Sequence, residues 1–126
     1  MKKVLAAINL IIIQHKILTI SRKKNLNDFN LPGGGVEKNE IPLQAAVREL
    51  KEEVGLTATS ADFVYKRIIQ PSGKEVHTFR INSFEGEPKN QPGEGIIKLL
   101  SPDELCQSTN TYHQYNIDLL RHLNLI

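Results

Sequence analysis

The sequence predicts one domain, residues 1–126, with an α/β (α+β) fold. Three observations predict it: an apolar run near the N-terminus, a helical pattern over residues 42–55, and strand-like segments after that helix. Continuous apolar runs and period-two alternation are typical of strands, whereas apolar residues three and four apart are typical of helices. A chain of 126 residues also matches the usual length of one domain.

The first predicted element is a β-hairpin made by residues 4–13 and 16–20. The first run is almost continuously apolar, which predicts a central strand that is buried on both faces. Together with Met1, Lys2 and Lys3 it resembles a signal peptide, but no small-residue cleavage site follows. The run is also shorter than the ~18 residues of a membrane-spanning helix, so we expect a strand and no contact with a membrane.

A loop and a well-bounded helix follow the hairpin. Residues 22–30 are basic and rich in asparagine, which predicts an exposed loop, and the Leu-Pro-Gly-Gly-Gly of residues 31–35 cannot continue a regular element. Pro42 suits the first position of a helix, and Gly55 suits its left-handed cap. The apolar stripe that we expect to pack on the sheet comprises Leu43, Ala46, Val47, Leu50 and Val54.

The remainder is predicted to form a second hairpin, a short strand and helices. The hairpin comprises residues 62–70 and 75–84, and residues 96–100 form a strand. Residues 101–104, Ser-Pro-Asp-Glu, have the pattern of a helix capping box, and residues 112–123 have helical periodicity.

The composition excludes several classes of protein. Hydrophobic residues make up 40% and charged residues 24%, which is globular rather than disordered or fibrous. The net charge is +2, without a clustered basic stripe, so we expect no duplex nucleic acid as a partner. The single cysteine, Cys106, excludes an internal disulfide and suits a reducing compartment, so we expect a cytoplasmic protein. The sequence predicts no oligomeric state.

Three glutamates of the predicted helix point to chemistry. Glu49, Glu52 and Glu53 lie at positions i, i+3 and i+4, so their carboxylates project from one side of the helix. Like charges at these spacings repel each other, and acids in a last helical turn oppose the helix dipole. Clustered carboxylates are the ligands that Mg²⁺ or Mn²⁺ requires. The alternative is a solvated acidic face with Arg48 and Lys51 as ion-pair partners.

The residues around these glutamates favour the metal site because they form a longer motif. The motif reads Gly34, five residues, Glu40, seven residues, Arg48-Glu49-Leu50, one residue, Glu52-Glu53, one residue, Gly55-Leu56. In these 23 residues the chain resembles a complete Nudix box, and the order of the flanking elements is similar to that of the small Nudix domain. The resemblance implies an α/β/α sandwich, with a mixed β-sheet between helices.

The resemblance implies that Glu49, Glu52 and Glu53 bind the metal and act in catalysis, with Mg²⁺ as the cofactor and Mn²⁺ as its substitute. The implied reaction is hydrolysis of the pyrophosphate linkage in a nucleoside diphosphate joined to a further group, a small-molecule substrate. A bound metal draws charge from the phosphoryl oxygens and orients a water molecule. A carboxylate must accept the proton of that water, and Glu49 and Glu53 are both candidates.

The other motif residues are expected to hold the shape of the site. Gly34 lets the backbone turn sharply into the loop before the helix. By the family pattern, Glu40 and Arg48 brace that loop on the helix as an ion pair, and Gly55 ends the helix.

The substrate class is indicated by residues 84–94. Their Phe-Glu-Gly-Glu-Pro and Gln-Pro-Gly-Glu resemble a loop of MutT-type Nudix enzymes, which remove oxidised purine nucleoside triphosphates. This implies hydrolysis of a nucleoside triphosphate to a nucleoside monophosphate and pyrophosphate. The loop is shorter here, which leaves a further metal ligand open between Glu85, Glu87 and Glu94. Asn110 lies near the position of a base-reading asparagine of that group, and its amide can pair with a purine edge.

A base would also need an aromatic side chain to stack on. The chain has no tryptophan, and we expect several of its other aromatic residues in the core. The candidates for stacking are Phe29, Phe63, Phe79, Tyr112 and Tyr115.

Three alternatives stay open. Pro71 stands near a proline of ADP-ribose-cleaving relatives, although a turn at residues 71–73 explains it too, so an ADP-ribose or nucleotide-sugar pyrophosphatase ranks second. A non-catalytic nucleotide-binding regulator is the alternative from another class, but all glutamates of the box are present. Hydrolysis of capped or triphosphorylated RNA would need a basic groove, and Arg22, Lys23 and Lys24 form the only tight basic cluster in the sequence.

Overall fold

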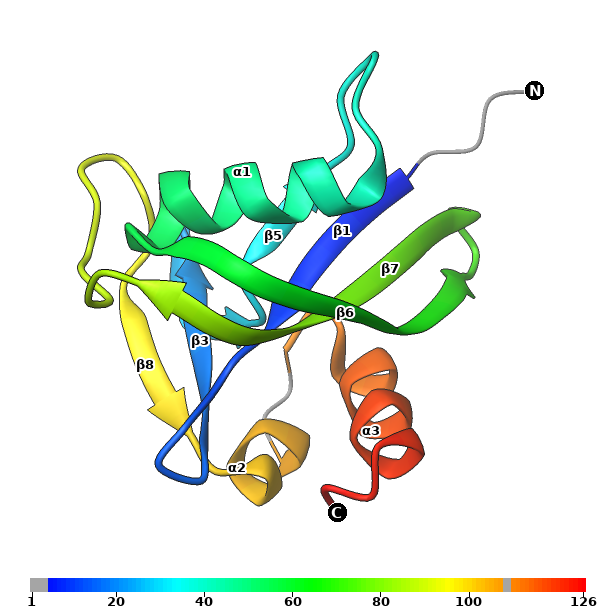
Figure 1. Cartoon of the computed structure of the whole chain (residues 1–126). Helices are drawn as coiled ribbons and strands as arrows, with labels where there is room; N and C mark the ends of the chain where they lie inside the picture. Colours follow the sequence, from blue (N-terminus) through cyan, green and yellow to red (C-terminus); the bar gives the residue numbers. More distant parts are fainter. Residues whose placement is uncertain (1–4, 108–109) are drawn as a thin grey trace.

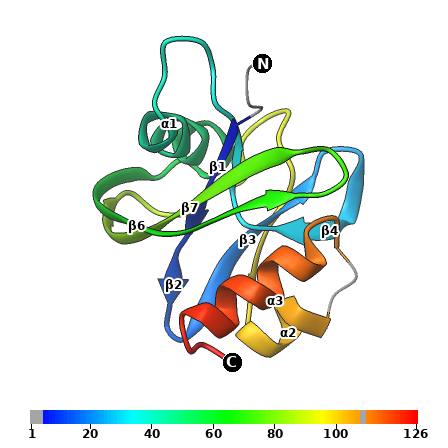
Figure 2. The ribbon, with the colours of Figure 1, turned by 90° about the vertical axis from the view of Figure 1, so that its right-hand side faces the viewer.

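A computed structural model describes residues 5–107 and 110–126, and Val4, with which the first predicted strand begins, lies outside them. The framework consists of two β-sheets (Figures 1 and 2). The first sheet has the order β5 (Gly33–Gly35), β1 (Leu5–Leu10), β7 (Lys74–Glu85) and β6 (Thr57–Ile69). Because β1 runs parallel to β7 while the other pairs are antiparallel, this sheet is mixed, as predicted.

The second sheet is antiparallel and centres on β3 (Lys16–Arg22). It pairs β3 with β2 (Ile12–Ile13), with β4 (Asn25–Asn30) and with β8 (Ile97–Leu100). The predicted N-terminal hairpin is therefore confirmed between β2 and β3. Its first run does not form one strand, however, because the chain leaves the first sheet after Leu10 and enters the second at Ile12.

Helices cover both faces of the mixed sheet (Figure 1). Helix α1 (Pro42–Val54) lies on one face and α3 (His113–His122) lies on the other, while α2 (Pro102–Gln107) packs beside α3 and against β8. Two apolar clusters fill the interfaces. Ala7 of β1 belongs to the cluster under α1, and Leu10 belongs to the cluster under α3. For residues 5–10 of the predicted strand, the central position and the burial on both faces are thus confirmed.

The ends of α1 lie where the sequence predicts them. Pro42 occupies the first turn, and Gly55 takes the left-handed conformation of the C-terminal cap with a φ of 83°. The predicted stripe needs correction at two positions, because Leu43 is 37% exposed and Val47 is only partly buried, while Ala45 is fully buried. At its start the helix contacts the sheet through Ala45 and Ala46, whose small side chains allow a close approach.

Two loop predictions are wrong. The stretch 22–30 contains strand β4, whose residues 25–27 are exposed while Phe29 is buried. Residues 33–35 form β5 and pair with residues 6–8 of β1. In both cases the backbone hydrogen bonds of a neighbouring strand outweigh the low strand propensity of asparagine and glycine. The side chains alone did not reveal these edge strands.

The second half of the chain agrees with the prediction in element type. Strands β6 and β7 form the second hairpin, and β6 begins five residues earlier than predicted, at Thr57. The capping box of α2 is present, since Ser101 Oγ accepts a hydrogen bond from the Glu104 N–H at 3.1 Å and Glu104 Oε1 accepts one from the Ser101 N–H at 2.8 Å. Helix α3 buries Tyr115, Leu119 and Leu120 against the sheet.

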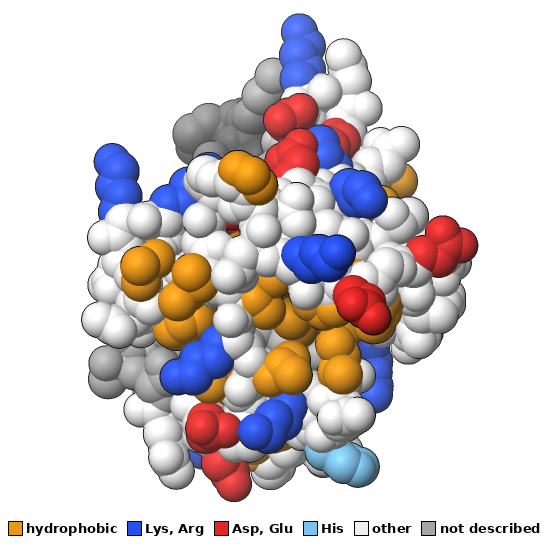
Figure 3. Space-filling model, turned by 90° about the vertical axis from the view of Figure 1, so that its left-hand side faces the viewer, with side chains coloured by type: hydrophobic (Ala, Val, Ile, Leu, Met, Phe, Trp, Pro, Cys, Tyr) orange, Lys and Arg blue, Asp and Glu red, His pale blue; other side chains and the backbone are white. Residues whose placement is uncertain are grey.

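The surface in Figure 3 carries basic and acidic side chains interspersed around a band of hydrophobic ones. On this face, therefore, no continuous basic stripe is visible that would follow a nucleic-acid backbone. Within the described part of the chain, no helix has the length and apolar character needed to cross a membrane.

Candidate active site

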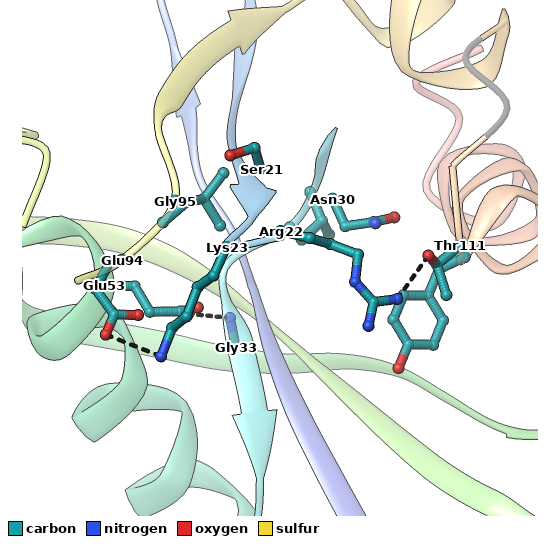
Figure 4. A pocket seen from close by; sticks show the side chains of 12 residues that line it. Ser21, Arg22, Lys23, Asn30, Gly33, Glu53, Glu94, Gly95 and Thr111 are labelled. Carbon is teal, nitrogen blue, oxygen red and sulfur yellow. Dashed lines mark hydrogen bonds and ion pairs between the residues drawn. The ribbon is translucent and has the colours of Figure 1, made fainter. Parts of the chain in front are cut away.

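A pocket of about 200 Å³ lies where segments far apart in the sequence meet (Figure 4). Helix α1 contributes Glu53 from its last turn, and the loop before β8 contributes Glu94. The turn between β3 and β4 adds Lys23, and the end of β3 adds Arg22. Two carboxylates and two positively charged side chains therefore line one cavity. This arrangement suits the binding of both metal ions and phosphate groups.

Glu53 is held in this pocket by the backbone. Its Oε1 accepts a hydrogen bond from the Gly33 N–H at 2.7 Å, which ties the last turn of α1 to β5. Burial is the main cause that raises the pKa of Glu53 to about 8, and the neighbouring charges of Glu49 and Glu94 act in the same direction, while the hydrogen bond from Gly33 opposes them. Without a compensating cation, this carboxyl group is protonated over much of the neutral range.

Glu94 faces Glu53 because its loop packs very closely on β3. An added Cβ at Gly95 would lie 2.0 Å from the carbonyl oxygen of Ser21, so only glycine allows this approach. The Ile96 N–H also donates a hydrogen bond to Ser21 Oγ at 2.9 Å. In this position Glu94 forms an ion pair with Lys23, with 3.4 Å between Oε2 and Nζ (Figure 4).

Arg48 ties the loop before α1 to the helix. Its Nε and Nη2 donate to the two carboxylate oxygens of Glu40 at 2.7 and 3.0 Å, and Nη2 also donates to the Gly35 carbonyl at 3.1 Å. The hydrogen bond from Arg48 lowers the pKa of Glu40 to about 2, and the pKa of the Arg48 guanidinium rises in turn. The structure therefore contains the predicted ion pair, in the bidentate geometry that fits a guanidinium and a carboxylate.

The same guanidinium also contacts two of the three helix glutamates. Arg48 Nη1 lies 2.8 Å from Glu49 Oε1 and 3.4 Å from Glu52 Oε2. Glu52 is the more open of the two, with 54% of its side chain exposed. The three glutamates thus lie on one side of α1 as predicted, while in the described residues no three acidic, histidine or cysteine side chains are arranged as a metal-binding group.

The donor set nevertheless fits a divalent cation. All of its groups are carboxylates, the oxygen ligands that Mg²⁺ and Mn²⁺ prefer. An added Cβ at Gly34 would lie 2.7 Å from Glu49 Oε1, so the glycine leaves the space that this carboxylate occupies. Glu49 and Glu94 form ion pairs with Arg48 and Lys23, and a bound cation can replace these contacts.

The far wall of the pocket is held by a polar network. Arg22 Nη1 donates to Thr111 Oγ1 at 3.0 Å, and Figure 4 shows Arg22 pointing away from Lys23. The hydroxyl of Thr111 in turn donates to Asp28 Oδ2, and its N–H donates to Asp28 Oδ1 at 3.1 Å. Strand β4 and the segment before α3 are fixed together by these bonds.

Other residues singled out from the sequence lie outside this pocket. Glu85 and Glu87 are exposed and are not among the described lining residues, whereas Glu94 is. Asn110 is 7% exposed, and its Nδ2 donates to the Phe29 carbonyl at 3.0 Å. Its Oδ1 lies 3.4 Å from Asn116 Nδ2, so both ends of the amide already have a partner.

The aromatic residues that are candidates for stacking on a base differ in how far they are buried. Phe29, Phe79 and Tyr115 are core residues, and Phe63 is 53% exposed on β6. Tyr112 is half-buried and lines the pocket. It is therefore the aromatic candidate with access to a ligand beside Glu53.

Sequence reasoning missed the roles of Lys23, Arg22 and Gly95 in the architecture of the pocket. The cluster of Arg22, Lys23 and Lys24 was visible as a basic run, but a run does not show which of its members turn inward. Gly95 gave no signal, because its close approach to Ser21 joins residues 74 positions apart.

Comparisons with known proteins agree with this geometry. A family model described as the NUDIX domain matches residues 2–123. The chain is 33% identical over 103 residues to the 8-oxo-dGTP diphosphatase of Escherichia coli (strain K12), which covers 75% of this chain and 80% of that protein. It is 32% identical over 97 residues to the CTP pyrophosphohydrolase of the same strain, covering 73% of this chain and 71% of that protein. Among solved structures, the E. coli ORF135 protein has a TM-score of 0.82 and 28% identity, covering 98% of this chain and 90% of that one.

Proposed function

The chain belongs to the Nudix family and is a Nudix hydrolase, and on this premise we propose that it hydrolyses a nucleoside triphosphate to a nucleoside monophosphate and pyrophosphate. In this reaction the anhydride bond between the α- and β-phosphoryl groups breaks, and the oxygen of water joins one of the two phosphorus atoms. The observation that carries the proposal is the pairing of Glu53 and Glu94 with Lys23 and Arg22 in one pocket. Such a pocket has carboxylates that can bind metal ions and positively charged side chains that can bind a polyphosphate.

We propose that Glu49, Glu52 and Glu53 hold the divalent metal, Mg²⁺ or its substitute Mn²⁺, and that Glu94 is the further ligand. When bound, such a metal supplies Lewis-acid chemistry and neutralises charge on the phosphoryl oxygens. Glu94 is preferred to Glu85 and Glu87 because it lines the same pocket as Glu53, while those two are exposed.

Glu53 is the proposed acceptor of the proton from the attacking water. It lines the pocket, and the hydrogen bond from the Gly33 N–H fixes its carboxylate there. Glu49 is the weaker candidate because its carboxylate accepts the hydrogen bond from Arg48 and it is not among the described lining residues. Gly34, Glu40, Arg48 and Gly55 would then position the helix and its loop rather than contact the substrate.

Asn110 has a supporting part in this proposal. Its hydrogen bond to the Phe29 carbonyl holds the chain just before Thr111 and Tyr112, which do line the pocket. Asn110 is only 7% exposed, so little of its amide is available for a direct contact with a base.

The names of the two curated relatives support a triphosphate, since both 8-oxo-dGTP and CTP are nucleoside triphosphates. The ADP-ribose alternative gains no support from Pro71, which lies in the turn between β6 and β7 and is not a described lining residue. Of the basic cluster, Arg22 and Lys23 face the pocket, which favours a small nucleotide over an RNA groove. The cytoplasmic location stays a prediction.

The test is a substrate panel with 8-oxo-dGTP, the common nucleoside triphosphates, ADP-ribose and a 5′-triphosphorylated RNA. We expect pyrophosphate release from triphosphates with Mg²⁺, its loss with EDTA, and a loss of about 10²–10⁴-fold in kcat for Glu53→Gln. Glu85→Gln is the matched control, because Glu85 is an exposed glutamate outside the pocket. Nucleotide binding without turnover would refute the catalytic proposal and would favour the alternative, a non-catalytic nucleotide-binding regulator. AMP released from ADP-ribose alone would refute the proposed substrate class.

A further inference from the structure

A second, smaller pocket adjoins the one that holds Glu53. It has a volume of about 100 Å³ and shares Leu31, Gly33 and Tyr112 with the larger pocket. A ligand whose phosphate groups lie beside Glu53 therefore has room for its other end in the smaller pocket, with Tyr112 at the junction.

The walls of this smaller pocket suit a flat aromatic ring. Ala6 and Ile8 of β1 and Val76 of β7 are apolar, and the backbone of β5 forms a side without any side chains. Because β5, β1 and β7 are neighbours in one sheet, these residues offer a surface for one face of a nucleobase, which also needs polar groups at its edge. Among the described residues, the polar side chains that line the pocket are Lys74, Tyr112 and Tyr115.

Of these three, Tyr115 is committed to the fold. Its hydroxyl shares a hydrogen bond of 2.6 Å with Thr78 Oγ1 and lies 3.4 Å from the Val76 carbonyl, and the residue is 5% exposed. Lys74 is different. Its Nζ donates to the Tyr112 hydroxyl at 3.2 Å and lies 5.8 Å from the centre of that ring. An ammonium group carries three donors, so this bond leaves it capacity for a ligand.

We propose that Lys74 and Tyr112 select the base of the nucleotide. Lys74 donates a hydrogen bond to a carbonyl oxygen at the edge of the base, and Tyr112 holds the ammonium group in place and contacts the base with its ring. Guanine, 8-oxoguanine, cytosine and uracil carry such a carbonyl oxygen, whereas adenine carries none. This inference rests on the proposed function and adds a preference for carbonyl-bearing bases over adenine.

The first experiment compares kcat/KM for dGTP, dCTP and dATP in the wild type and in Lys74→Met. Methionine keeps the length of the side chain and removes its donors. We expect the variant to lose roughly 10- to 100-fold on dGTP and dCTP and little on dATP, which is the range for one hydrogen bond to a charged donor. Lys66→Met is the control, because Lys66 is exposed on β6 and is not among the described residues of either pocket.

A merely structural role for Lys74 would lower all three values alike, and that result would overturn the proposal. A wild-type enzyme that hydrolyses dATP as well as dGTP and dCTP would overturn it too. Tyr112→Phe is the second variant. It keeps the ring and removes the anchor of Lys74, so the preference against dATP should weaken while thermal unfolding stays near that of the wild type.

A binding experiment tests this inference independently of the proposed function. dGMP, dCMP and dAMP are titrated into Glu53→Gln protein with and without Lys74→Met, and the heat of binding is measured. The inference requires dGMP and dCMP to bind more tightly than dAMP, and requires Lys74→Met to remove that difference, even if no triphosphate is hydrolysed. Equal affinities for the three monophosphates in Glu53→Gln protein would overturn the inference and leave the hydrolysis proposal untouched.

Discussion

The carboxylate of Glu53 in the last turn of α1 accepts a hydrogen bond of 2.7 Å from the backbone N–H of Gly33 in β5. This bond fixes a helix side chain against a strand without using a second side chain. It does not offset the burial of the group, since the pKa of Glu53 is raised to about 8. The pocket thus contains a carboxyl group whose ionised form lacks sufficient compensation until a cation is bound.

The first prediction concerns stability against pH in the presence of EDTA. The pKa of Glu53 in the folded protein, about 8, is above its ordinary value of 4.5, so the folded state binds the proton more tightly than the unfolded state. This contribution to the free energy of unfolding is full below about pH 4.5 and is lost as the pH rises through 8. Thermal unfolding between pH 5 and 9 should show the decline, and Glu53→Gln should flatten it. An equal decline of thermal stability in the wild type and in Glu53→Gln would contradict the assignment of the pH dependence to Glu53.

A second prediction distinguishes the three loop glutamates. Glu94→Gln should weaken Mn²⁺ binding by roughly tenfold or more, which is the order of effect expected when a ligand or its close support is lost. Glu85→Gln and Glu87→Gln should leave the affinity unchanged, because both side chains are exposed outside the pocket. Calorimetric titration of the metal measures this without any substrate. Weaker binding in Glu87→Gln than in Glu94→Gln would assign the further ligand to the other part of the loop.

The third prediction concerns Arg48, which connects Glu40, the Gly35 carbonyl and Glu49. Removing it should lower the free energy of unfolding by about 1–2 kcal/mol, because the bonds are charge-assisted but partly exposed to water. Arg48→Lys should fall between the wild type and Arg48→Ala, since lysine cannot form the bidentate pair. Urea unfolding measures the difference. Lys51→Ala is the control on the same helix, and equal stability of the two alanine variants would exclude the bracing role.

The helix and its carboxylates could be predicted from the sequence because their information is local. Proline and glycine bound α1, and the spacing of Glu49, Glu52 and Glu53 places them on one side of it. Local patterns do not contain the information about which strands pair with each other. The asparagine-rich stretch became β4 because β3 offered it backbone partners, and the glycines at 33–35 became β5 for the same reason beside β1.

The same limit applies to the pocket. Glu94 could be distinguished from Glu85 and Glu87 only by the contact between its loop and β3, which depends on long-range packing. Lys23 was part of a visible basic run, but its direction depends on the turn between β3 and β4. The smaller pocket joins residues of β1, β5, β7 and the start of α3, and no spacing in the sequence connects these.

The last prediction tests how Glu94 is brought to the pocket. An added Cβ at Gly95 would lie 2.0 Å from the Ser21 carbonyl oxygen, a backbone atom that cannot give way easily. Gly95→Ala should therefore lower the free energy of unfolding by about 1–3 kcal/mol and weaken Mn²⁺ binding, because the loop must move and carry Glu94 with it. Gly35→Ala is the control for stability, since an added Cβ there meets nothing within 4 Å. Urea unfolding and metal titration check the two effects separately. If Gly95→Ala lost stability but kept its metal affinity, the close approach would hold the fold together without positioning Glu94, and the further ligand would have to be sought elsewhere.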